Sequence, residues 1–164
     1  MYFLNQANRA RQSEAQTYVG SVNRAQQAYR LENTEFADAI SKLGIGIPVE
    51  TEFYHYGNGT DSETLGEIPS GQIGNSVQAV AKQQDEALRG YLGVTFVATD
   101  QQGNATTVAG LCQGRPNAER NTPTATISNA GGNASVTFGG AEDDCADIAG
   151  PGAAGTEGGG TEGQ

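Results

Sequence analysis

The chain has 164 residues, enough for one domain with a hydrophobic core and too few for two. Only 36% of the residues are hydrophobic and 24 are glycines, which argues against a compact helical bundle and for a modest core with long loops. The net charge is −10; residues 1–31 carry four arginines and one glutamate, or +3, so the remainder carries −13, and this acidic body is not expected to bind nucleic acid directly.

The first 31 residues are predicted to form one long amphipathic helix. They contain no proline and a single glycine, and they are rich in Ala, Gln and Arg, which favour helices. Hydrophobic residues recur at steps of three and four on one face: Ala15, Tyr18, Val22, Ala25 and Tyr29. The opposite, polar face is expected to carry Arg9, Gln16, Asn23, Gln27 and Arg30. Such a helix would be roughly 45 Å long, so its apolar face must lie on another surface.

The next segments alternate in predicted type. Residues 34–43 are expected to form a short second helix with Thr34 as its N-cap. Residues 49–56 are rich in β-formers and predict a strand that ends at a Gly-Asn-Gly turn. A polar loop follows, and Ser76 is expected to open an amphipathic helix of about three turns that reaches Leu88.

Two hairpins are predicted in the second half of the chain. Residues 91–99 alternate in polarity as a strand does, residues 100–104 form a turn, and residues 106–112 form the return strand. Residues 124–127 and 134–138 form a second pair of strands around an Asn/Gly-rich turn. From residue 150 the chain repeats Gly-Thr-Glu-Gly without a large apolar residue, so this tail is expected to be disordered.

The chain has two cysteines, Cys112 and Cys145, and no metal-ligand spacing around them. An even pair suits one disulfide in an oxidising compartment, which would stabilise the fold by about 3–4 kcal/mol. The alternative is two unrelated buried thiols in a cytosolic protein. That alternative conflicts with the sequence around Cys145, which is too polar for a core.

No group of residues predicts catalysis or a cofactor. The single histidine, His55, lies in a predicted strand and is expected to pack or to be displayed, since no serine or cysteine motif accompanies it. The Gly44-x-Gly46 pair lacks the third glycine and the following helix of a nucleotide site. Four acidic residues could hold Ca²⁺, although their spacing matches no EF-hand and solvated side chains are the simpler reading: Glu142, Asp143, Asp144 and Asp147.

Two strings in the predicted helix, residues 5–15 and 23–29, carry a resemblance to a known family. Together with residues 43–48, the Tyr54-x-Tyr56 strand, and the 92–112 hairpin with a second cysteine near the end, they resemble type IV pilins, above all the pilin-like G and H group of the cyanobacterial type. The resemblance implies an α+β fold in which a long N-terminal helix packs on a small antiparallel β-sheet with a disulfide-bounded C-terminal loop. It divides the chain into the helix at 1–31, a globular head at 32–149 and the tail at 150–164.

What the resemblance implies for function is assembly without catalysis. Family members begin with an apolar half-helix that is not present here, so the chain is expected to be N-terminally truncated, and the membrane would be contacted through that segment alone. The expected role is a structural subunit, a major or minor pilin. It would polymerise with other pilin subunits through its N-terminal helix, with the help of assembly machinery in the inner membrane, and then display its head at the cell surface for adhesion, motility or DNA uptake. The helix face expected to serve assembly is the apolar stripe: Ala15, Tyr18, Val22, Ala25 and Tyr29.

Two other readings stay open at this point. A pseudopilin of a type II secretion system would use a calcium loop in place of the disulfide, and a soluble extracellular binding module with a helical stalk would need no preceding apolar segment. Arg9 and Arg11 could contact anionic lipid head groups or acidic residues of a neighbouring subunit.

Overall fold

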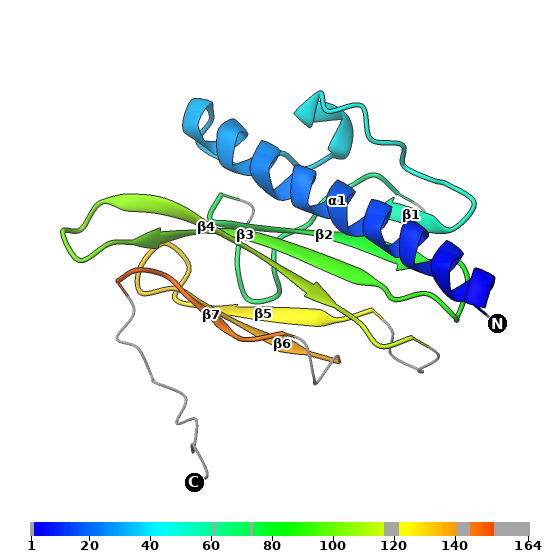
Figure 1. Ribbon diagram of the computed structural model, residues 1–164. Helices are drawn as coiled ribbons and strands as arrows, with labels where there is room; N and C mark the ends of the chain where they lie inside the picture. The colour runs from blue at the N-terminus through cyan, green and yellow to red at the C-terminus, as the bar shows by residue number, and fades with distance from the viewer. Residues whose placement is uncertain (1, 61, 73, 117–121, 141–144, 153–164) are drawn as a thin grey trace, which may run out of the picture.

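The computed structural model describes residues 2–60, 62–72, 74–116, 122–140 and 145–152, and these form three layers (Figure 1). The long helix α1 (Tyr2–Glu32) covers one face of a four-stranded sheet, and a three-stranded sheet covers the other. The first sheet has the order β1 (Tyr54–Gly57), β2 (Ser76–Gln83), β3 (Tyr91–Thr99), β4 (Ala105–Gln113). The second has the order β5 (Thr124–Ser128), β6 (Ser135–Gly139), β7 (Ile148–Ala149). All pairs are antiparallel, which confirms the predicted α+β class.

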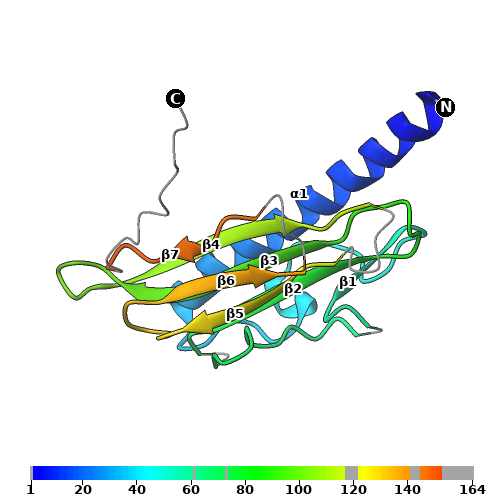
Figure 2. The same ribbon diagram turned by 90° about the horizontal axis from the view of Figure 1, so that it is seen from below.

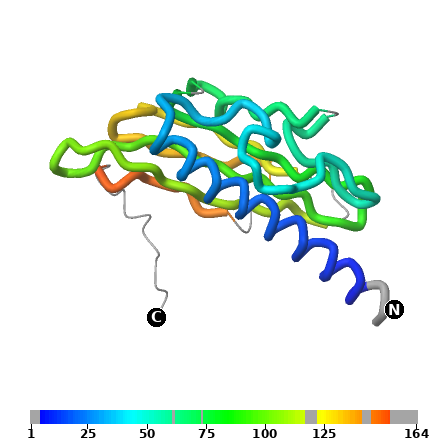
Figure 3. Tube along the Cα trace, turned by 90° about the horizontal axis from the view of Figure 1, so that it is seen from above, coloured from blue at the N-terminus to red at the C-terminus, as the bar shows by residue number. Residues whose placement is uncertain are grey.

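The helix α1 is continuous and only partly supported by the head. Among its side chains that the structure describes, from Asn5 onward, the first buried one is Ala15. Figures 2 and 3 show its first turns projecting past the end of the sheet. The helix ends where Asn33 caps it, because the Nδ2 of Asn33 donates to the carbonyl of Tyr29 at 2.9 Å.

Strand β3 lies at the centre of both cores. Tyr91 and Val97 face α1, whereas Leu92 and Phe96 face the second sheet, as the predicted alternation required. Gly93 lies on the α1 side, and a Cβ atom there would come within 2.5 Å of the Cγ1 atom of Val19. The helix therefore approaches the sheet closely at the one position of β3 that has no side chain.

The second sheet packs on the first through its own hydrophobic core. Ile127 of β5 and Val136 of β6 meet Leu92 and Phe96 of β3 in this core. The predicted hairpin of residues 124–127 and 134–138 is confirmed, with Thr124 opposite Gly139 and Ser128 opposite Ser135 in the register. The molecule thus has two cores, one under the helix and one between the sheets.

The predicted helix over residues 76–88 is wrong, because residues 76–83 form β2. Both faces of β2 are buried: Val77, Ala79 and Ala81 pack under α1, and Val80 packs toward the second sheet. A strand that is apolar on both faces loses the period-two pattern, and its valine and alanine spacing then also fits a helix.

The predicted helix over residues 34–43 is also wrong in extent, since only a 3-10 helix, η1 (Ile40–Leu43), is present and Thr34 caps nothing in it. Long-range bonds replace the helical ones: the backbone N–H of Ile40 donates to the carbonyl of Glu63, and that of Leu65 donates to the carbonyl of Asp38. The segment is held by a neighbouring loop and not by its own turns.

The strand predicted over residues 49–56 begins only at Tyr54 and runs to Gly57. The chain folds back on itself before that point, because the backbone N–H of Tyr56 donates to the carbonyl of Val49 and the hydroxyl of Thr51 accepts the N–H of Tyr54.

The predicted disordered tail, residues 150–164, lies outside the described residues from residue 153 onward. Its first residues belong to the fold: the N–H of Gly150 donates to the carbonyl of Ala134 at 2.8 Å, and Gly150 is buried.

Candidate functional site: the N-terminal helix and the disulfide segment

The apolar stripe of α1 faces the protein's own sheet. Ala15, Val19 and Val22 are buried against the strands, whereas Tyr18 is only partly covered. The stripe was predicted as an assembly face made of Ala15, Tyr18, Val22, Ala25 and Tyr29. Ala15 and Val22 are buried against the chain's own sheet, so within this chain they serve the packing of α1 on the strands. Tyr18, Ala25 and Tyr29 keep partial exposure, and their contact with a neighbour stays a prediction.

Amide side chains attach α1 to the backbone of the head. The Nδ2 of Asn23 donates to the carbonyl of Gly110 in β4 at 2.8 Å, and the Nε2 of Gln27 contacts the carbonyl and hydroxyl of Thr107 at 3.4 and 3.3 Å. Asn23 and Gln27 were predicted on the solvent-facing side. That prediction is wrong because a polar residue satisfied by a backbone group can occupy a buried position.

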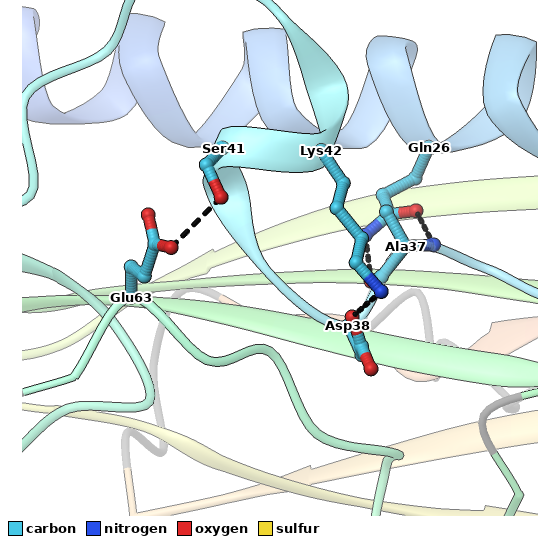
Figure 4. A network of polar contacts seen from close by, with 6 residues as sticks. All are labelled: Gln26, Ala37, Asp38, Ser41, Lys42 and Glu63. Carbon is cyan, nitrogen blue, oxygen red and sulfur yellow. Dashed lines mark hydrogen bonds and ion pairs between the residues drawn. The ribbon is translucent and has the colours of Figure 1, made fainter.

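Gln26 makes the most buried of these attachments. It is 1% exposed, and its carboxamide pairs with both backbone groups of Ala37, donating to the C=O and accepting from the N–H, each at 2.8 Å (Figure 4). The same view shows the exposed pairs Asp38–Lys42 and Ser41–Glu63 in the segment that follows. Gln26 therefore joins the helix to the segment that follows it through one donor–acceptor pair, as two neighbouring β-strands are joined.

Replacing Gln26 by leucine is expected to destabilise the fold by about 2–3 kcal/mol, because two buried backbone groups of Ala37 lose their partner. Chemical denaturation measures the loss. The matched control is Gln16→Leu, since Gln16 is exposed on the same helix and should change the unfolding free energy by less than about 0.5 kcal/mol. Equal effects at the two positions would show that the carboxamide pairing contributes nothing.

The arginines of α1 have different environments. The guanidinium of Arg11 lies over the ring of Phe53, with its Cζ atom 3.7 Å from the ring centroid, and the Nε of Arg30 donates to the carbonyl of Gly74 at 3.0 Å. Arg9 is exposed, and Arg24 is exposed and bonded to Ser21. Arg11 therefore has a cation–π contact within its own chain, whereas contact of Arg9 with lipid or with a neighbour stays a prediction.

Four tyrosines fill the interface between α1 and the first sheet. The rings of Tyr18 and Tyr56 meet edge to face at 5.3 Å, and Tyr54 lies between Tyr56 and Tyr91. The hydroxyl of Tyr54 donates to the carbonyl of Arg89 at 2.7 Å. Burial raises the pKa of Tyr54, Tyr56 and Tyr91 above the ordinary tyrosine value, so these rings stay neutral and serve packing.

The two cysteines form the predicted disulfide, which joins β4 to the segment that leads into β7. Cys112 is fully buried, and Cys145 follows 33 residues later in the chain. Of the four acidic calcium candidates, Glu142, Asp143 and Asp144 lie outside the described residues. Asp147 is described, and its carboxylate accepts the N–H of Phe138 at 3.1 Å.

No reactive constellation is present in the described part of the chain. His55 is 8% exposed and lies opposite Lys82 in the β1–β2 register. Among the described residues, no three His, Cys, Asp or Glu side chains gather as a metal site. No helix in the described ranges combines the length and the apolar run that a membrane crossing requires.

Comparison with known proteins agrees with this geometry. Residues 12–137, from the middle of α1 to β6, match the family of type IV pilin-like G and H proteins. Neither the curated proteins nor the solved structures give a significant match. A long helix docked on an antiparallel sheet, a disulfide near the C-terminal end and a family match over most of the length lead to one conclusion: the chain belongs to the type IV pilin-like G and H family, with a pilin-like structural role.

Proposed function

We propose that this chain is a structural subunit, a major or minor pilin, of a type IV pilus. The observation that carries the proposal is the uneven support of α1, a 31-residue helix whose described buried side chains begin at Ala15, whereas its first turns, before the contact of Arg11 with Phe53, project from the head (Figure 2). The projecting part of the helix would be the surface that other subunits contact, and the head would then face the medium.

The partners that fit this arrangement are other pilin subunits, alike or different, together with assembly machinery in the inner membrane. The subunit would reside in that membrane before assembly and at the cell surface afterwards. Adhesion, motility and DNA uptake are the roles that remain for the head. Direct contact with DNA is the least favoured of them, because the chain carries a net charge of −10.

The disulfide supports a pilin over a pseudopilin. The pseudopilin alternative was expected to close its C-terminal loop with calcium, whereas here a covalent bond between Cys112 and Cys145 closes that region. Asp147, the one calcium candidate among the described residues, accepts the N–H of Phe138 in β6.

Leu31 provides the sharpest test of assembly through α1. It lies at the end of the helix and is 86% exposed. Among the described side chains, no other large hydrophobic residue is exposed to this extent. Leu31→Gln in the native gene product should leave the melting temperature unchanged, because nothing buried is altered and Gln favours helices as Leu does. If subunits bury this side chain, incorporation into sheared surface filaments should fall about tenfold or more.

The control for this experiment is Thr126→Gln, an exposed position on the outer face of β5. Its incorporation should equal that of the parent. The proposal is wrong if the parent protein is absent from surface filaments. Assembly through this end of α1 is wrong if Leu31→Gln and Thr126→Gln enter filaments equally well.

A further inference from the structure

A notch lies where the N-terminal half of α1 passes β1 and the segment before it (Figure 1). Its volume is about 340 Å³, which is more than one leucine side chain fills. The ring of Phe53 and the methyl group of Ala10 contribute to its apolar lining. Ala10 is exposed and Phe53 is only partly covered, so a neighbouring molecule can reach both. We call this feature the α1 notch.

The α1 notch also contains charged side chains. The guanidinium of Arg11 lies over the ring of Phe53, with its Cζ atom 3.7 Å from the ring centroid. One of its N–H groups contacts Asn8 at 3.4 Å, and an arginine has five, so donors remain for an anion. Glu14 and Glu52 are exposed members of the lining and form no ion pair with any described residue. The notch thus combines an apolar wall with one cation and two carboxylates.

The opposite end of α1 carries the matching groups. Leu31 is exposed there, and its neighbours in the sequence are Arg30 and Glu32. Because a helix has 3.6 residues per turn, these two neighbours flank Leu31 on its two sides. Glu32 is exposed and forms no ion pair within the described ranges. Arg30 donates through Nε to the carbonyl of Gly74 at 3.0 Å and keeps further N–H groups for a carboxylate.

We propose that copies of this chain associate head to tail, with Leu31 of one copy in the α1 notch of the next. Leu31 would pack against Phe53 and Ala10 and leave water. The contact is the form that assembly through α1 would take, so it rests on the proposed function. Two different surfaces meet in it, and such a contact can repeat into a filament. The helix rises roughly 30 Å from Arg11 to Leu31, so copies with parallel helices would be offset by that length.

The charged groups of the two surfaces are complementary. Glu32 would meet the guanidinium of Arg11. Arg30 would meet Glu14 or Glu52, the two carboxylates of the α1 notch. A small apolar ligand would leave these charged groups unpaired. A second copy of the chain carries the leucine and both charges on one turn of helix, so it is the occupant that fits the notch best.

NMR of the ¹⁵N-labelled full chain in solution tests the contact without filaments. As the protein concentration is raised, the amide resonances of Leu31 and Phe53 should shift together. Leu31→Gln removes the inserted side chain and Ala10→Trp fills the α1 notch. Each should weaken self-association about tenfold or more, because the leucine is no longer buried. The control variants Thr126→Gln and Gln16→Trp, at exposed positions outside both surfaces, should leave it unchanged.

Mixing the two variants tests the head-to-tail geometry. The Leu31→Gln chain keeps the notch and the Ala10→Trp chain keeps Leu31, so the mixture should form a dimer that neither variant forms alone. With the Leu31→Gln chain labelled, the amide of Phe53 should shift and that of residue 31 should not. With the Ala10→Trp chain labelled, the amide of Leu31 should shift and that of Phe53 should not. A symmetric contact would give the same pattern on both chains.

Photo-crosslinking in filaments gives an independent reading, and it decides if Ala10→Trp fails to fold. Leu31→p-benzoylphenylalanine in the native gene product should attach to residues 10–14 or 51–54 of a second copy. The contact is overturned if the crosslinks fall on other residues, or if the folded variants do not shift each other's resonances when mixed. Absence of the parent protein from surface filaments would overturn the proposed function instead, and the shifts in solution would still establish the contact between copies.

Discussion

Gly93→Val is expected to lower the free energy of unfolding by about 3 kcal/mol or more. A Cβ atom at this position would lie 2.5 Å from the Cγ1 of Val19 and 2.6 Å from the Oδ1 of Asn23, so α1 would have to move away from β3. Overpacking of this kind costs about 1–3 kcal/mol by itself, and the displaced Asn23 would also lose its bond to the carbonyl of Gly110. Thermal unfolding followed by circular dichroism should show a melting temperature lower by roughly 10 °C.

Gly66→Ala is the matched control for this substitution. Gly66 also lies in a backbone bridge to the first sheet, opposite Gln78, but a Cβ atom there would meet nothing within 4 Å. Its melting temperature should stay within about 2 °C of the parent. If Gly93→Val is as mild as Gly66→Ala, the close approach of helix and sheet does not determine how α1 docks.

Reduction of the Cys112–Cys145 disulfide is expected to cost about 4 kcal/mol, the chain-entropy value for a loop closed over a separation of 33 residues. The loss should appear first at β7, because the bond ties the segment before β7 to β4 and no other covalent link does so in the described chain. Ile148 of β7 lies against Gly110 of β4, so its release would open the core between the sheets.

The experiment compares denaturation of the oxidised chain with that of the reduced and alkylated chain, with hydrogen exchange at Ile148 as the local measurement. The double variant Cys112→Ala/Cys145→Ala should show the lower stability with or without reductant. An unchanged unfolding free energy after complete reduction would contradict the stabilising role assigned to this bond.

The sequence predicted best the elements whose composition and pattern both favour one type of structure. The strand at residues 91–99 is buried on both faces, but its aromatic and β-branched residues favour a strand, which distinguishes it from a helix. The helix at the N-terminus was legible because one side of it is exposed along its length. In both cases the local pattern and the tertiary environment agree.

Prediction failed where long-range contacts replace local ones. Residues 34–43 have a composition typical of a helix. However, the carboxamide of Gln26 pairs with the backbone of Ala37, and residues 63 and 65 pair with the backbone of residues 40 and 38, so a regular helix cannot form. Strand β2 was read as a helix because burial on both faces removed its alternation. The segments that pack against residues 34–43 and against β2 could not be identified from a single sequence.

The candidate site was predicted in outline and not in detail. The helix and the disulfide followed from residue types and spacing. The rotation of the helix did not, because Asn23 and Gln27 were assigned by polarity to the face opposite the apolar stripe, whereas the structure bonds both to backbone carbonyls of β4.

The amide attachments of α1 have a consequence for how such a subunit can diversify. Asn23 and Gln26 bind main-chain atoms of residues 110 and 37, and Gln27 contacts the main-chain carbonyl of residue 107 as well as its hydroxyl. Every amino acid supplies a main-chain carbonyl, and every one except proline supplies a main-chain N–H. These hydrogen bonds therefore depend little on the side chains of the head. Most side chains of the head could therefore change during evolution of its outer surface, and α1 would still form these hydrogen bonds with the head.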